Sequence, residues 1–139
     1  MHNNPETYTV ESSFEFLDAQ KAGYAFLGWY IDASFTTPIE AISAGATGNL
    51  TLTAKWDTIG YTITYHNVEG ATHSNPNSYD IEDQSSKLSA ASRDGYRFVG
   101  WYTDGAFTNM VTEIPVGTTG NLDLYAKWEI IEYTITYNF

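Results

Sequence analysis

The sequence predicts a mainly β fold (α+β at most) in two small tandem modules, and two observations carry this prediction. First, a shift of 72 residues aligns residues 23–67 of the 139-residue chain with residues 95–139 without a gap, and 25 of the 45 paired residues are identical. Second, each copy consists of short segments rich in β-branched and aromatic residues, separated by turn signals and without a sustained helical period. We therefore expect two repeated modules of short strands with little helix.

The most regular segment of each copy is Gly-Tyr-x-Phe-x-Gly-Trp-Tyr-x-Asp, at residues 23–32 and 95–104. Strict alternation along a strand would put Phe98 on one face and Trp101 on the other. Glycine weakens a strand interior unless something needs the room. Gly100 and its counterpart in the first copy therefore predict a bulge or a close aromatic contact.

Three further segments complete each copy. The sequence Leu-x-Leu-x-Ala-Lys-Trp follows a Thr-Gly-Asn turn and alternates like a strand, with Leu, Ala and Trp on one face. The pentapeptide Tyr-Thr-Ile-Thr-Tyr, at residues 61–65 and 133–137, has strong strand propensity. A short strand is also expected after the Asn-Pro turns, at Tyr8 and Tyr79. The segment between that strand and the Gly-Tyr block shows no clear period, so we expect it to be irregular.

These blocks, in this order, resemble the Listeria-Bacteroides repeat, the module that also forms the B-repeat of the listerial internalins. The resemblance implies a β-grasp-like (ubiquitin-like) module that occurs in arrays in large bacterial surface proteins, extracellularly at the cell surface or cell wall. There it extends or supports an adhesive region, and the family pattern carries no catalytic residues. By the family order, residues 1–58 are a first module without its opening strand, residues 61–129 a complete second module, and residues 133–139 the opening strand of a third.

Composition argues against several classes of partner. The chain has 17 acidic and 6 basic residues, a formal charge of −11, and no basic run, so nucleic acid and anionic lipid are poor partners. It has no cysteine for a disulfide or a thiolate metal site. No apolar run has the length of a membrane span, and the polar start predicts neither a signal peptide nor an anchor in this stretch.

Several polar residues are candidates for catalysis or metal binding, but we favour a structural role for each of them. His2, His66 and His73 lie in polar segments without metal-ligand spacing, so we expect exposed loop histidines. Asp32 and Asp104 follow Trp-Tyr in both copies, and a turn or cap role is favoured over calcium binding or a catalytic pair. We therefore expect no catalytic residue, no cofactor and no metal site.

Lys55 and Lys127 could form an internal isopeptide crosslink. The alternation of the Leu-x-Leu-x-Ala-Lys-Trp strand, however, places both on the face opposite tryptophan, so solvated lysines are favoured. The repeated aromatic pairs admit a sugar-stacking platform, although their fixed strand positions favour core packing; the residues are Trp29, Tyr30, Trp101 and Tyr102. Tyr125 is the exception, because it lies opposite the apolar face and is Thr53 in the first copy. It is expected at the surface.

Two functions follow from these readings. The first is a non-enzymatic repeat module that acts as a spacer, stalk or adhesion-supporting segment. The second is direct binding of a host protein or glycan through an exposed strand edge or surface aromatics. An enzyme is disfavoured.

The terminal pentapeptide predicts self-association. A strand-prone segment without a module of its own and a module without its opening strand should pair, and the connector at residues 129–132 spans at most about 14 Å. We therefore expect head-to-tail exchange through Tyr133, Ile135 and Tyr137. The alternative is a local hairpin in which residues 133–137 fold back on residues 122–128, although Glu-Ile-Ile-Glu lacks the Gly or Asn of a tight turn.

Overall fold

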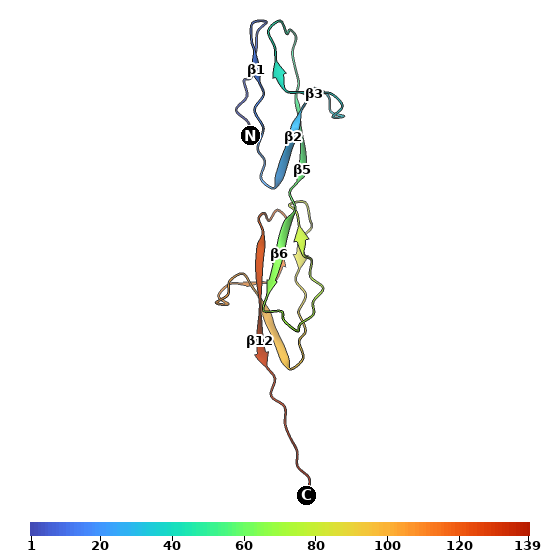
Figure 1. Cartoon of the computed structure of the whole chain (residues 1–139), viewed down its shortest axis with the longest axis vertical. Helices are drawn as coiled ribbons and strands as arrows, with labels where there is room; N and C mark the ends of the chain where they lie inside the picture. Colours follow the sequence, from blue (N-terminus) through green and yellow to red (C-terminus); the bar gives the residue numbers. More distant parts are fainter. The chain divides into compact units, whose positions relative to one another are not determined.

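The structure is a computed structural model that describes all residues, 1–139, and it contains short strands and no helix (Figure 1). The chain divides into two compact units, unit 1 (Met1–Ile59) and unit 2 (Gly60–Phe139). The fold is mainly β with small mixed sheets, which confirms the predicted fold class.

Unit 2 is built on a five-stranded sheet with the order β10-β9-β12-β6-β7. Its strands are β6 (Tyr61–His66), β7 (Ser78–Tyr79), β9 (Tyr96–Tyr102), β10 (Met110–Val111) and β12 (Leu122–Ile130), and β8 (Ser86–Lys87) pairs separately with β11 (Glu113–Ile114). All neighbours are antiparallel except β6 and β12, which run parallel with Ile63 beside Leu122. The pentapeptide at residues 61–65 is therefore an inner strand of this sheet.

Unit 1 repeats part of this arrangement. Its strands are β1 (Phe14–Glu15), β2 (Tyr24–Tyr30), β3 (Pro38–Ile39), β4 (Ala41–Ile42) and β5 (Thr53–Thr58). They form a three-stranded sheet, β3-β2-β5, and a separate β1-β4 pair. The two-residue strands β1 and β8 correct the expectation that the segments after the first short strand are irregular, because β4 and β11 supply edges on which they pair.

No strand of unit 1 takes the place that β6 has in unit 2, and the neighbouring segments differ accordingly. β12 begins at Leu122, whereas β5 begins only at Thr53, three residues after the counterpart of Leu122. Tyr79 lies in β7 against β6, whereas Tyr8 lies in no strand. The prediction of a strand at Tyr8 is therefore wrong. In unit 1 no strand lies between Tyr8 and residues 50–52, so their backbone groups lack the pairing that β6 gives their counterparts in unit 2.

The inner glycines mark a β-bulge in both units. Opposite β12, Gly100 pairs with Lys127 while Phe98 pairs with Trp128, so Val99 is an extra residue, and β2 has the same shift between Phe26 and Gly28. The predicted bulge is confirmed. The predicted separation of Phe98 from Trp101 is wrong, because one extra residue reverses the alternation and brings their ring centroids to 5.2 Å.

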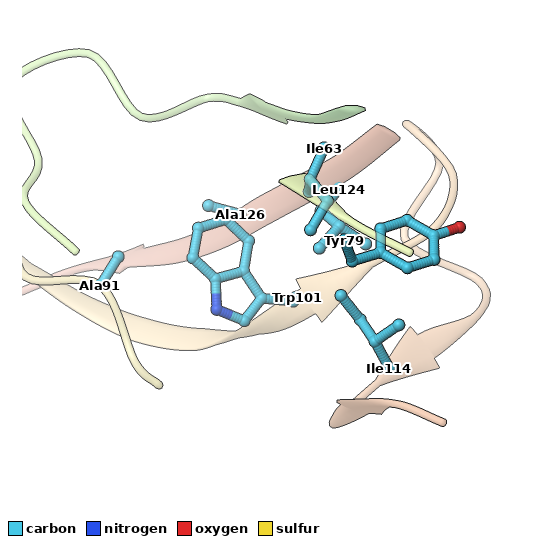
Figure 2. Close-up of a cluster of buried hydrophobic side chains, with 7 residues drawn as sticks. All are labelled: Ile63, Tyr79, Ala91, Trp101, Ile114, Leu124 and Ala126. Carbon is cyan, nitrogen blue, oxygen red and sulfur yellow. The ribbon is translucent and has the colours of Figure 1, made fainter. Parts of the chain in front are cut away.

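The core of unit 2 is one cluster of buried side chains (Figure 2). Its buried side chains are Ile63, Tyr79, Ala91, Trp101, Ile114, Leu124 and Ala126. Leu124 is 1% exposed and Trp101 2% exposed. The Trp101 indole N–H donates to the Ser89 carbonyl at 2.8 Å, which satisfies its only polar atom. The predicted apolar face of residues 122–128 is thus confirmed.

Residues 131–139 form no strand in the single chain. Tyr133, Ile135 and Tyr137 are 72%, 76% and 71% exposed. The hairpin alternative is not formed, because β9 and β6 already occupy both edges of β12. A segment with strong strand propensity therefore lies without a strand partner.

Candidate functional site

Asp32 and Asp104 each hold a tight turn. The Asp104 carboxylate accepts hydrogen bonds from the Thr108 hydroxyl at 2.6 Å, the Thr108 amide at 3.0 Å and the Asn109 amide at 2.9 Å. Asp32 accepts the same bonds from Thr36 and Thr37. These bonds, the Thr hydroxyl bond foremost, lower the pKa of both carboxyl groups below their usual value. The predicted turn role is confirmed.

These turns lead to an acid-stability prediction. A lowered pKa in the folded state stabilises the fold above the ordinary value of 3.8, and this contribution is lost as the pH falls through the folded pKa. We expect Asp104→Asn to lower the unfolding midpoint of unit 2 at pH 7 and to make its decline below pH 4 shallower. Urea unfolding at pH 2 to 7 measures this, with the exposed Asp94→Asn as the matched control. Parallel pH profiles for the parent and Asp104→Asn would contradict it.

Each turn also places a phenylalanine in the left-handed region, at φ 56° for Phe35 and 57° for Phe107. This conformation is unfavourable for a side chain with a Cβ. The Phe107 ring meets the Tyr102 ring edge-on at 5.4 Å, and the Lys127 Nζ lies 5.7 Å from the Phe107 centroid. Lys127 is thus half-buried over aromatic rings. Lys55 is half-buried in the same way over Tyr30 and Phe35. Both observations correct the expectation of solvated lysines.

Two of the three histidines are not exposed loop residues. His66 belongs to β6, where its ring stacks on Tyr125 at 4.4 Å and its Nε2 lies 2.8 Å from the Asp123 carboxylate. His73 is half-buried with its ring 4.3 Å from that of Tyr65. The expectation holds only for His2. The partners of His66 lie nearly sixty residues away in sequence, so no local pattern signalled its packing.

The repeated aromatic pairs differ between the units. Trp101 and Tyr102 are buried, which confirms core packing in unit 2, whereas Trp29 and Tyr30 are only half-buried. Tyr125 is half-buried and covers Gly105, where its Cε1 lies 3.6 Å from an added Cβ. It therefore lies on the sheet face opposite Leu124, as predicted, but is less exposed than a free surface tyrosine.

An open groove of about 760 Å³ lies in unit 1. Its lining includes the apolar side chains Tyr8, Trp29, Ile42 and Leu52 together with residues 46–50. In unit 2 the counterparts of these four side chains are Tyr79, Trp101, Ile114 and Leu124, all buried. The groove thus lies at the place that β6 covers in unit 2. Sequence reasoning named the missing strand but not this groove, although the repeat alignment holds the signal.

Tyr65 shows how the strand is held in unit 2. Its hydroxyl donates to the Pro76 carbonyl at 2.5 Å, and its ring lies 5.1 Å from that of Trp101. Burial raises the pKa of Tyr65 from 10.0 to about 12, because the phenolate would lose its hydration.

This shift leads to an alkaline-stability prediction. A raised pKa in the folded state gives stability that is complete below pH 10 and is lost as the pH rises towards about 12. We expect the unfolding midpoint of unit 2 to fall across this range and the fall to become shallower in Tyr65→Phe. Tyr137→Phe, the exposed counterpart, should retain the parent slope. Denaturant titrations between pH 9 and 12 measure it, and equal slopes for the two variants would argue against it.

The structure contains neither a metal-binding cluster nor a membrane-spanning helix. The structure groups no three His, Asp or Glu side chains in a way that could hold a metal ion. It also contains no helix with the length and apolarity needed to cross a bilayer.

Comparisons with known proteins place the chain in a family. A model of the Listeria-Bacteroides repeat domain matches residues 3–55 and again residues 61–127. Two proteins of Evansella cellulosilytica named as membrane proteins, one of them Gly-rich, are each 30% identical to the chain over 118 and 123 residues, or 85% of it. The chain spans only 18% and 14% of their lengths, and no solved structure matches it significantly. The chain belongs to the Listeria-Bacteroides repeat family and contains two copies of its repeat.

Proposed function

We propose that this chain is a non-enzymatic spacer or stalk segment that supports adhesion in a protein of the bacterial cell surface or cell wall. The observation that carries the proposal is the repeat itself: two units built from the same blocks follow one another, with only Ile59 and Gly60 between β5 and β6. Repeat arrays gain stability from each unit and its neighbours, and they add length with every copy. The family is associated with bacterial surface proteins.

The relatives support the same conclusion. A chain that spans less than a fifth of two proteins named as membrane proteins corresponds to a segment of a longer molecule. Its charge of −11 favours solubility and mutual repulsion of neighbouring molecules at a crowded surface.

The proposal is tested by measuring how far displayed chains of different length extend from a cell surface. Chains with one, two and three 72-residue periods are displayed on a bacterial surface with an epitope at the outer end. Antibody-coated beads that are kept at a distance by the surface polysaccharide should bind the epitope increasingly with each added period, while a flexible Gly/Ser segment of equal length serves as the control. Turnover of a polysaccharide or peptide by the purified chain would overturn the non-enzymatic role.

A second candidate function is direct binding of a host protein or glycan. Tyr125 favours it, because its ring stacks on His66 on the sheet face opposite the core and has no counterpart in the first repeat, where Thr53 stands. A glycan and matrix-protein array probed with the chain and with Tyr125→Thr tests it. Signals that are absent, or equal for both proteins, would count against binding through this aromatic pair.

A further inference from the structure

Two Asp-Gly dipeptides occur in the chain, Asp94-Gly95 and Asp104-Gly105, and both lie in turns of unit 2. The equivalent positions of the first repeat are Ala22-Gly23 and Asp32-Ala33, so unit 1 has no such dipeptide at either place. In an Asp-Gly dipeptide the second residue has no side chain to shield its backbone nitrogen. That nitrogen is therefore able to attack the aspartate side chain.

The attack closes a succinimide ring. The glycine nitrogen bonds to the aspartate Cγ and gives up its proton, while the hydroxyl of the neutral carboxyl group leaves as water. Water then opens the ring at one of its two carbonyl carbons. Addition at Cγ restores aspartate, whereas addition at the main-chain carbonyl carbon gives isoaspartate, in which the backbone runs through Cβ and Cγ. The water that is released is regained, so the net change is an isomerisation.

Hydrogen bonds hold the Asp104 carboxylate in its turn and away from this reaction. They come from the Thr108 hydroxyl at 2.6 Å, the Thr108 amide at 3.0 Å and the Asn109 amide at 2.9 Å. The carboxylate has to leave these donors before its Cγ reaches the Gly105 nitrogen. The same bonds, the Thr108 hydroxyl bond foremost, lower the pKa of Asp104, so less of it is in the neutral form whose hydroxyl leaves.

The Asp94 side chain has none of these restraints. It is exposed, accepts no hydrogen bond and forms no ion pair. Asp94 and Gly95 are the two central residues of a turn that is closed by a bond from the Tyr96 amide to the Arg93 carbonyl at 3.1 Å. The Gly95 amide donates no backbone hydrogen bond, so the attacking nitrogen is not engaged elsewhere.

The first repeat shows that this turn forms without a carboxylate. There the Tyr24 amide donates to the Lys21 carbonyl at 3.1 Å, and Gly23 has a φ of 81°, close to the 80° of Gly95. Ala22 stands at the position of Asp94. The fold of the turn therefore does not depend on the Asp94 side chain.

We propose that Asp94-Gly95 is a site of slow spontaneous modification, at which aspartate passes through a succinimide to isoaspartate, whereas the turn of Asp104 protects Asp104-Gly105. The product adds one atom to the main chain inside the closed turn. It weakens the bond from Tyr96 to Arg93 and the neighbouring bond from the Ile131 amide to the Gly95 carbonyl, now 3.0 Å. The modification thus loosens the start of β9 and the end of β12 and leaves unit 1 unchanged.

The proposal is tested by ageing the folded 139-residue chain at pH 6 and 37 °C in water labelled with oxygen-18, followed by digestion in unlabelled water and mass spectrometry. Each passage through the ring exchanges one oxygen of the aspartate for a labelled one, and isoaspartyl peptides separate from aspartyl peptides on chromatography. We expect Asp94 to gain label about tenfold faster than Asp104, because the loss of a hydrogen bond to a charged group slows a reaction by about that factor.

Two variants and an unfolded control separate the effect of structure from that of sequence. Thr108→Val removes only the hydroxyl donor, so it should speed labelling of Asp104 and leave the rate at Asp94 unchanged. In concentrated urea the turns are lost, and the two dipeptides should react at similar rates. Exchange protection of the Tyr96 amide should fall as isoaspartate accumulates, but not in Asp94→Ala, which has the residue of the first repeat and keeps the turn.

The opposite outcomes are equally clear. No label at Asp94, equal rates at the two dipeptides of the folded chain, or faster labelling of Asp104 would each overturn the proposal. So would a difference between the dipeptides that persists in urea, or an unchanged rate at Asp104 in Thr108→Val.

Discussion

Trp101→Ala is expected to destabilise unit 2 by about 3 to 5 kcal/mol, which is comparable to the whole stability of a small module. Trp101 is 2% exposed, packs against the β6 strand through Tyr65 and against Phe98 across the bulge, and uses its indole N–H in a bond to Ser89. Its removal leaves a cavity at the centre of the cluster, while the Ser89 carbonyl keeps the Asn75 side-chain amide as a donor. Hydrogen exchange of the Leu124 amide, followed by NMR, reports the free energy of opening unit 2.

The repeat supplies the control for this substitution. Trp29 occupies the same position in unit 1 and donates the equivalent bond to Leu17, but it is half-buried beside the open groove. Trp29→Ala therefore removes less buried surface and should cost unit 1 less than half as much, measured on the Ala54 amide. Equal costs at the two positions would show that the groove is closed in solution.

Much of the fold follows from local pattern. The glycine in the middle of each Gly-Tyr block indicated the bulge, because a residue without a Cβ is tolerated where the ladder is disturbed. A Cβ on Gly100 would lie 3.0 Å from the Met110 Cε and 3.6 Å from the Tyr102 ring, and a Cβ on Gly28 would lie 3.6 Å from the Tyr30 ring, so an aromatic ring is close to the glycine in both units. The alternation of Leu122, Leu124 and Ala126 correctly assigned the buried face of β12.

Features that depend on distant partners were not predicted. His66 is packed because Tyr125 and Asp123, nearly sixty residues away, lie on the neighbouring strand, and a single sequence does not show which strands are neighbours. The strand expected at Tyr8 is absent for the same reason, since strand structure there needs the partner that Tyr79 has in β6. Phe107 in the left-handed region was also missed, because glycine and asparagine are the usual residues there.

For the candidate site, the repeat alignment paired Tyr8, Trp29 and Leu52 with residues of the second copy but did not show how they meet. Only the structure shows that Tyr8, Trp29 and Leu52 line one groove, because Tyr8 is more than twenty residues from Trp29 and more than forty from Leu52 along the chain. A groove is a property of tertiary packing, and the local periods of the sequence do not contain it.

Ile63→Ala is expected to destabilise unit 2 by about 2 to 5 kcal/mol, although the identical change in the second pentapeptide should have almost no effect. Ile63 is 5% exposed at the centre of the cluster, in the strand that joins β7 to β12. Ile135 has the same neighbours in sequence but is 76% exposed, and surface substitutions of this kind usually stay within about 0.5 kcal/mol. The pair separates the effect of sequence from the effect of environment.

The comparison uses urea unfolding of both variants at the same low protein concentration, so that contacts between chains do not contribute. The Leu124 amide reports on unit 2, and the Ala54 amide reports on unit 1 as an internal control that neither variant should change. A cost for Ile135→Ala close to that for Ile63→Ala would mean that the terminal segment is already seated in the monomer. A negligible cost for Ile63→Ala would contradict the central place of Ile63 in the core of unit 2.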